Sequence, residues 1–218
     1  MFCKFRSTMG VTERRAREKE ELRQKILDAA GQLFVEEGFA NVSVRKIADR
    51  IEYSPATIYL YFKDKTDLFS SLCWETFSNL KAQLDCIEQE GGDAVLALRK
   101  GLRSYIDFGL QHPNHYLLTF CTPIDHSAQQ ENEDFRETNQ VGLETFDHLR
   151  RALERCRLSG DLQFEDLETT SQVVWTFIHG TTSLMILNCG DPHFPWVPKE
   201  RLIESSLDMI LRSLRPAA

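Results

Sequence analysis

The segment SPATIYLYFKDK, from Ser54 to Lys65, places two phenols and two ammonium groups close together. Tyrosine hydroxyls and lysine ammonium groups donate hydrogen bonds to anionic oxygens such as those of phosphate. Leu60 stands between Tyr59 and Tyr61, and an apolar side chain in that place can contact the methyl group of a thymine. The segment therefore offers binding chemistry directed at phosphates and base edges.

A helix-turn-helix is the expected support for this segment. Apolar residues recur at helical spacing over 20–38, and a glycine ends the run. A second, short helix over 43–51 has Ser43 as its expected N-cap, and a third over about 55–62 has Ser54. These two short helices, joined by a tight turn and preceded by a longer helix, match the motif.

The outer face of the third predicted helix is slim. At about 100° per residue, Ile58 and Phe62 point to one side and Leu60 points to the opposite side. Small residues, Ala56 and Thr57, accompany Leu60, and a tyrosine lies on each flank. The major groove of DNA is about 12 Å wide, so a slim helix with donors on both flanks fits it. Packing of the tyrosines against neighbouring helices is the alternative, but it does not explain an outward leucine.

Charge is distributed unevenly along the chain. The net charge is −7, yet residues 1–65 hold 13 Lys and Arg against 10 Asp and Glu, whereas residues 66–218 hold 13 against 23. Six of the basic residues precede Glu20, which is typical of a mobile basic arm over 1–19. The asymmetry indicates that the N-terminal part faces a polyanion.

The stretch VSVRKIADRIEYSPATIYLYFKDKTDLF, preceded by ILDAAGQLFVEEGFA, resembles the N-terminal DNA-binding domain of the TetR/AcrR transcriptional repressors. The resemblance covers about Arg23 to Leu68. It implies that operator DNA is contacted by Arg45, Ser54, Ala56, Thr57, Tyr59, Leu60, Tyr61 and Lys65; the predicted DNA-binding set also includes Pro55. The turn departs from the family pattern at Glu52, where a glycine is usual, and a positive φ there would cost on the order of 1 kcal/mol.

The remainder of the chain is expected to form a larger helical domain. Helical spacing predicts a short helix after Pro113 and longer helices over about 67–89, 93–111, 133–159, 166–188 and 199–214. No strand alternation is evident, so the predicted fold class is all-α. The expected domains are a flexible basic arm over 1–19, a helix-turn-helix domain over 20–65, and an effector-binding and dimerisation domain over 66–218.

The last two predicted helices are apolar on more than one side, so a second subunit is expected to bury part of their surface. The family resemblance implies that they form a four-helix bundle across a two-fold axis. The residues predicted at this interface are Leu184, Ile203, Leu207, Ile210, Leu211 and Leu214. A dimer would present two recognition helices about 34 Å apart, which matches successive major grooves of a palindrome.

Two further segments, WTFIHG (175–180) and FGLQHPNHYLLTF (108–120), resemble one C-terminal subtype of the family that carries a Trp and a His-Gly pair in its penultimate helix. This resemblance implies a cavity for a small-molecule inducer, lined by Tyr105, Phe108, Tyr116, Phe120, Trp175 and His179. The aromatic lining favours a lipophilic or aromatic inducer. Each of these residues is equally compatible with core packing.

Other chemistries fit the sequence less well. A metal sensor is suggested by His112, His115, Cys121 and His126, but Pro113 interrupts the helix between the first two. Redox sensing would need a reactive thiol at Cys121 or Cys189. An enzyme would need a nucleophile-base pattern, a glycine-rich phosphate loop or an HExxH motif, and the sequence contains none of them.

The sequence therefore predicts a cytoplasmic, homodimeric repressor that binds a double-stranded DNA operator and is released by a small-molecule inducer. No cofactor, catalytic residue or metal site is predicted. No segment approaches the roughly 20 apolar residues of a membrane span. An activator, or a metal- or redox-responsive regulator of the same fold, is the alternative.

Overall fold

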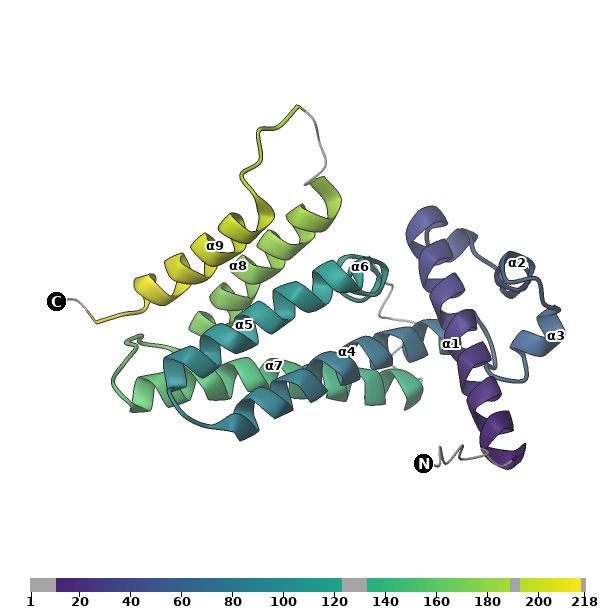
Figure 1. Cartoon of the computed structure of the whole chain (residues 1–218), viewed down its shortest axis with the longest axis horizontal. Helices are drawn as coiled ribbons and strands as arrows, with labels where there is room; N and C mark the ends of the chain where they lie inside the picture. The colour runs from purple at the N-terminus through teal and green to yellow at the C-terminus, as the bar shows by residue number, and fades with distance from the viewer. Residues whose placement is uncertain (1–10, 123–132, 189–192, 217–218) are drawn as a thin grey trace, which may run out of the picture. The chain divides into compact units, whose positions relative to one another are not determined.

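The computed structural model describes residues 11–122, 133–188 and 193–216 of the chain (Figure 1). These residues form helices and contain no strand, so the predicted all-α class is confirmed. The chain divides into two compact units, residues 1–69 and residues 70–218. Within the described ranges, no helix has both the length and the apolar character that crossing a membrane requires.

The first unit contains α1 (Val11–Glu37), the 3₁₀ turn η1 (Phe39–Asn41), α2 (Val44–Arg50), α3 (Pro55–Ile58) and the start of α4 (Lys65–Glu90). α1 begins earlier than expected: residues 11–19, predicted as part of a flexible arm, are helical, whereas residues 1–10 lie outside the described residues. Ion pairs at i,i+4 spacing, Arg14 with Glu18 and Arg17 with Glu21, support this first part of α1.

Side-chain caps fix the ends of the short helices. The Ser43 Oγ accepts a hydrogen bond from the Lys46 N–H at 3.3 Å, and the Ser54 Oγ accepts one from the Thr57 N–H at 3.2 Å. Asp64 Oδ1 accepts from two N–H groups in the first turn of α4, at 2.7 and 2.9 Å. The predicted caps at Ser43 and Ser54 are confirmed.

The turn between α2 and α3 holds one residue in the left-handed region. Glu52 has a φ of 63°, and it is the one residue other than glycine with positive φ in the described part of the chain. Such a conformation costs a residue with a side chain on the order of 1 kcal/mol, so the departure from glycine seen in the sequence carries a conformational cost. The Tyr53 N–H closes the turn by donating to the Ala48 carbonyl at 2.9 Å.

An apolar core holds the short helices of this unit in place. Ile47 of α2 and Ile58 of α3 are completely buried. The rings of Phe34, Phe39 and Phe69 contact one another in a cluster, with pairwise centroid distances of 5.2 to 6.1 Å. α3 is therefore fastened by Ile58, and its opposite side is left outward.

The second unit contains most of α4 together with α5 (Ala94–Gln111), α6 (Pro113–Cys121), α7 (Glu133–Leu158), α8 (Leu167–Asn188) and α9 (Lys199–Ser213). α5 is its central helix and packs against α6, α7, α8 and α9 (Figure 1). The bounds agree closely with the predicted helices. Asp93 caps α5 by accepting the Leu96 N–H at 2.7 Å.

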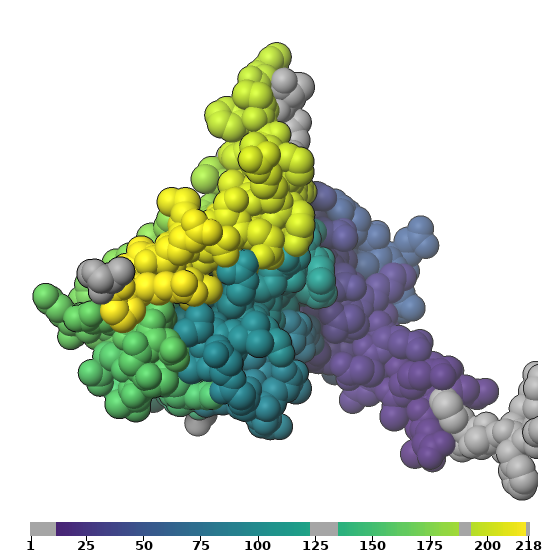
Figure 2. All heavy atoms as spheres, turned by 60° about the vertical axis from the view of Figure 1, so that its left-hand side comes forward, coloured from purple at the N-terminus to yellow at the C-terminus, as the bar shows by residue number. Residues whose placement is uncertain are grey.

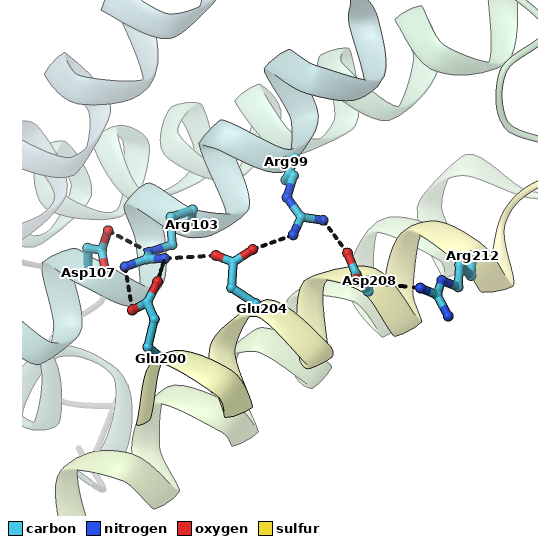
Figure 3. Close-up of polar contacts among 7 residues, drawn as sticks. All are labelled: Arg99, Arg103, Asp107, Glu200, Glu204, Asp208 and Arg212. Carbon is cyan, nitrogen blue, oxygen red and sulfur yellow. Dashed lines mark hydrogen bonds and ion pairs between the residues drawn. The ribbon is translucent and has the colours of Figure 1, made fainter. Parts of the chain in front are cut away.

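A row of ion pairs fastens α9 to α5 (Figure 3). The Arg99 guanidinium donates to Asp208 at 2.6 Å and to Glu204 at 2.5 Å. Arg103 donates to Glu200 at 2.6 Å and to Glu204 at 2.9 Å. The hydrogen bond from Arg99 lowers the pKa of Glu204 and of Asp208. α9 therefore lies on α5 through charge as well as through its apolar stripe, and it forms part of the surface of this unit (Figure 2).

Candidate functional site

The regular part of α3 is shorter than predicted, because it ends at Ile58 instead of about Phe62. The next residues continue as a tight turn in which the Leu60 N–H donates to the Thr57 carbonyl at 3.2 Å and the Tyr61 N–H to the Ile58 carbonyl at 2.9 Å. These i to i−3 bonds are of the 3₁₀ type, which is frequent at helix ends. Periodicity at 100° per residue did not indicate this tightening.

The predicted division of this segment into buried and outward residues is nevertheless present. Ile58 is 0% and Phe62 is 3% exposed, whereas Leu60 is 79% and Tyr59 is 56% exposed. Tyr61 is half-buried, so the two phenols are not equally available. The apolar side chain of Leu60 is therefore held outward, and the exposed phenol of Tyr59 lies beside it. We call the residues opposite Ile58, namely Ala56, Thr57, Tyr59, Leu60 and Tyr61, the α3 face.

Hydroxyl groups preorganise the start of the α3 face. The Ser54 Oγ lies 3.0 Å from the Thr57 Oγ1, so one of these hydroxyls donates to the other. Pro55 is at the first helical position, as predicted, and Ala56 beside it is exposed. This end of α3 therefore combines small side chains with two hydroxyls in fixed positions.

The two predicted cationic contacts differ in their surroundings. Arg45 is exposed on α2. The Lys65 ammonium instead donates to the Phe39 carbonyl at 2.7 Å and lies 4.3 Å from the centre of the Phe39 ring, and its partial burial lowers the pKa of this lysine. In this structure Lys65 stabilises the turn before α2, and a contact between Lys65 and phosphate stays a prediction.

A cavity of about 860 Å³ lies in the second unit, between α4, α5, α7 and α8, and α6 contributes one residue to its wall. Three of the six residues predicted to line it do so: Tyr105, Phe120 and Trp175. The other three, Phe108, Tyr116 and His179, are not in its wall. Leucines from α4, α5 and α7 supply much of the remaining lining, namely Leu80, Leu84, Leu98, Leu102, Leu143 and Leu149.

Tyr116 and His179 lie outside the cavity lining and form a hydrogen-bonded group with Tyr105, which belongs to the lining. The Tyr116 hydroxyl lies 2.7 Å from His179 Nδ1 and 3.1 Å from the Tyr105 hydroxyl. Burial raises the pKa of Tyr105 and Tyr116, and burial lowers the pKa of His179. All three groups are therefore held in their neutral forms, and Tyr105 presents a neutral hydrogen-bonding group at an apolar cavity.

Sequence reasoning missed the charged part of the lining, which comes from α4, α7 and α8: Glu88, Asp147, His148, Arg150, Arg155 and Glu168. On a helical wheel such residues indicate a solvated face, so periodicity alone does not assign them to a cavity. Arg150 donates to Asp147 at 3.0 Å and also pairs with Glu168. Its charge is thereby neutralised within the protein.

A second polar cluster contains His148, which is 6% exposed. Its Nε2 lies 2.9 Å from Asp85 and its Nδ1 lies 2.8 Å from Glu88. These three side chains have the atoms and spacing that could hold a metal ion, unlike the set suggested by the sequence, of which His126 lies outside the described residues. Lys81 and Arg151 neutralise the two carboxylates, so ion pairing accounts for the cluster without a metal.

Burial makes three of the described thiols poor candidates for redox sensors. Burial raises the pKa of Cys121, the residue suggested by the sequence. Burial also raises the pKa of Cys73 to about 12 and that of Cys156 to about 11. A raised thiol pKa disfavours the reactive thiolate. Cys189 lies outside the described residues.

The predicted interface residues require correction. Ile203, Leu207, Ile210 and Leu211 are buried in the core of their own unit, so they are not available to a partner. Leu214 packs against that core and is half-buried, so its place at an interface stays a prediction. Of the predicted set, Leu184 is exposed. The large apolar side chains that α8 and α9 leave exposed are Val173, Phe177, Leu184, Leu187 and Met209. We call these five residues the α8/α9 apolar surface.

Comparison with known proteins identifies relatives of both units. Residues 26–72 match the family described as "Bacterial regulatory proteins, tetR family", and residues 98–214 match "Tetracyclin repressor-like, C-terminal domain". The HTH-type transcriptional regulator AcrR of Shigella flexneri is 31% identical over 144 residues. That match covers 64% of this chain and 66% of the relative, so the chain spans about two thirds of the relative's length.

Solved structures share the fold at lower identity. The regulator FadR from Bacillus subtilis, in complex with stearoyl-CoA, has a TM-score of 0.70 at 22% identity, covering 88% of this chain and 99% of that chain. The ketosteroid transcriptional regulator KstR2 of Mycobacterium tuberculosis has a TM-score of 0.71 at 16% identity, covering 89% and 95%. The C-terminal family match alone spans more than half of the sequence. Together with the N-terminal match, it shows that this chain belongs to the TetR family of bacterial regulatory proteins.

Proposed function

We propose that this protein is a homodimeric, sequence-specific DNA-binding repressor that a small lipophilic molecule releases from a palindromic operator. The observation that carries the proposal is the α3 face. Leu60 is 79% exposed although it lies between two tyrosines in the tight turn that follows the capped helix α3. An outward leucine gains nothing from the fold of its own unit, whereas a thymine methyl group offers it an apolar partner.

The electrostatics support a nucleic-acid partner for the first unit only. The N-terminal 65 residues are net basic and the remainder is strongly acidic. Phosphate contacts supply most of the sequence-independent affinity for DNA, and base contacts supply the preference. On this proposal Tyr59 and Arg45 position the helix, and Leu60 with Thr57 reads base edges.

The α8/α9 apolar surface supports the homodimer. Val173 and Leu187, near the two ends of α8, are 61% and 62% exposed, and Met209 of α9 is 61% exposed. Exposed apolar side chains gathered on adjacent helices mark an interaction surface. A two-fold dimer buries the same surface on both subunits and pairs the two α3 faces for a palindrome.

The cavity supports a lipophilic effector. Its wall is built mainly of leucines and aromatic rings, as expected for a site that binds an apolar molecule. Stearoyl-CoA in the FadR structure and the ketosteroid in the name of KstR2 show that proteins of this fold are associated with lipid-derived molecules. We therefore place the inducer site in this cavity.

The coupling we propose runs through α4. This helix begins at Lys65, four residues after the end of the α3 face, and its later residues Phe77, Leu80 and Glu88 line the cavity. A ligand that fits the cavity better in one position of α4 shifts the population toward that position. The shift changes the separation of the two α3 faces in the dimer, so that they no longer enter successive grooves together.

The test is DNA release in solution. The full chain is titrated onto a fluorescent duplex recovered by selection from random DNA, and the anisotropy is followed with and without stearoyl-CoA or a steroid ketone. Loss of binding on addition of either molecule at constant salt supports an inducer-released repressor. Unchanged DNA binding by a protein that demonstrably binds the lipid would contradict release and would leave DNA binding itself in place.

A further inference from the structure

The ligand cavity is elongated along two helices. On α7 its lining extends from Asn139 to Arg155, which at 1.5 Å per residue corresponds to about 24 Å. On α4 it extends from Phe77 to Glu88, or about 16 Å. A ligand that fills this space is therefore long and narrow, with an apolar body against the leucines of the wall.

The charged side chains of the wall differ in whether the protein neutralises them. Arg150 is paired with two carboxylates, and His148 lies between two others. Arg155, which is half-buried at the last lining position of α7, has no hydrogen bond or ion pair through its guanidinium among the described residues. It is the one cationic side chain of the cavity wall for which the described part of the chain supplies no acidic partner.

A helix C-terminus favours positive charge, so the presence of an arginine in the last turn of α7 needs no ligand to explain it. Its neighbour Arg157 shows the ordinary arrangement, because it is exposed, lies outside the cavity wall and donates to Glu154 at 2.6 and 2.8 Å. Arg155 differs in facing the cavity without such a carboxylate. A guanidinium in that position binds carboxylate or phosphate in a bidentate manner.

We infer that Arg155 holds the anionic group of an elongated, mostly apolar ligand whose body fills the cavity along α7. The inference rests on the proposed ligand-binding function and specifies its ligand class as an anionic single-chain amphiphile. Carboxylate and phosphate share the required chemistry. Anchoring at the end of α7 places the chain of the ligand toward Phe120 and Trp175, among the leucines of α4 and α5.

Isothermal titration calorimetry of the full chain tests this with three sixteen-carbon probes below their aggregation concentrations: hexadecanoate, hexadecyl phosphate and hexadecanol. The wild-type protein should bind at least one anion about tenfold or more tightly than the alcohol, because charge-assisted hydrogen bonds are roughly twice as strong as neutral ones. Arg155→Ala should bring the affinities for that anion and the alcohol close together. Arg157→Ala, in the same helical turn, should retain the wild-type preference. The tighter anion identifies the head group.

Binding of hexadecanol by Arg155→Ala with wild-type affinity would show that the variant is folded and its cavity intact. Equal binding of the alcohol and both anions by the wild-type protein would overturn the inference, as would equal losses of preference in the two arginine variants. If none of the three chains binds, the amphiphile class is wrong. Release from DNA by a different molecule would then still support the proposed function.

Discussion

Leucine side chains occupy two contrasting places in this molecule. On the α3 face, Leu60 is 79% exposed and contributes little to the core of its unit. In the cavity wall, Leu98 and Leu102 are each 2% exposed and belong to the main core of the second unit. Leu60 can therefore be substituted without affecting the fold, whereas Leu98 and Leu102 contribute both to the fold and to the proposed ligand site. Function and stability are therefore separable in the first unit and coupled in the second.

The largest effect is expected within α3 and its turn, where two positions lie on opposite sides. Ile58→Ala removes a completely buried side chain and should lower the free energy of unfolding by about 2 to 5 kcal/mol. Leu60→Ala should change it by no more than about 0.5 kcal/mol. Urea denaturation of both variants measures this difference. Similar losses would show that Leu60 is part of the core and would remove the basis of the α3 face.

A tight approach in the second unit gives the next effect. A Cβ added at Gly109 of α5 would lie 2.5 Å from the Thr182 Cγ2 and 2.9 Å from the Tyr116 Cδ2. Gly109→Ala should therefore lower the free energy of unfolding by about 1 to 3 kcal/mol and disturb the wall beside Tyr105. Thermal unfolding is the measurement.

Gly180→Ala is the matched control, because no atom lies within 4 Å of the added Cβ within one chain. It should leave stability unchanged or raise it by up to about 1 kcal/mol, as expected for glycine replaced by alanine inside a helix. Equal destabilisation by both changes would mean that contacts with Thr182 and Tyr116 are not the reason why position 109 requires glycine.

Variants of the α3 face should separate positioning from base preference. Tyr59→Phe removes one hydroxyl from an exposed ring and should weaken binding to operator and random DNA alike, by about threefold to tenfold. Lys65→Ala should also weaken both. Leu60→Ala should change the preferred bases. Anisotropy titrations with both duplexes, each at fixed salt, measure these effects; equal losses on both duplexes for Leu60→Ala would contradict its assignment to base contact.

The smallest effect is expected in the pH dependence of stability. Burial lowers the pKa of His179, so the unfolded chain binds a proton more readily than the folded one. Stability should therefore fall as the pH drops below about 6.5, the ordinary histidine pKa, toward the lower pKa of the folded state. His179→Asn should reduce this slope in urea denaturation between pH 7.5 and 5.5. His112→Asn, at an exposed histidine, is the control. A slope that His179→Asn leaves unchanged would contradict the claim that burial lowers the pKa of His179.

The contrast between the two places also explains what the sequence could predict. Ser43, Ser54 and Asp93 act within three residues of themselves, so their caps follow from local sequence. The buried side of α3, which carries Ile58, also follows from the local residue pattern. The shortening of α3 depends on 3₁₀ bonds around Leu60, and no residue type in that segment marks them.

Long-range packing accounts for the remaining differences. The apolar stripe of α9 showed that Ile203 and Leu207 are buried, but periodicity does not tell whether the same chain or a partner buries them. α5 does so, with Arg99 and Arg103 fastening α9 beside it. The cavity likewise depends on side chains from five helices, and its polar wall residue Arg155 resembles any solvated arginine when the sequence is taken alone.

The central claim is that the α3 face reads a palindrome as part of a dimer. The most direct test is selection of bound duplexes from random DNA by the full chain, after unfolding and refolding to remove any co-purified ligand. We predict enrichment of a palindrome whose half-sites are about one helical turn apart, about 34 Å. Recovery of DNA without an enriched sequence, from refolded protein with native helical content, would contradict the claim.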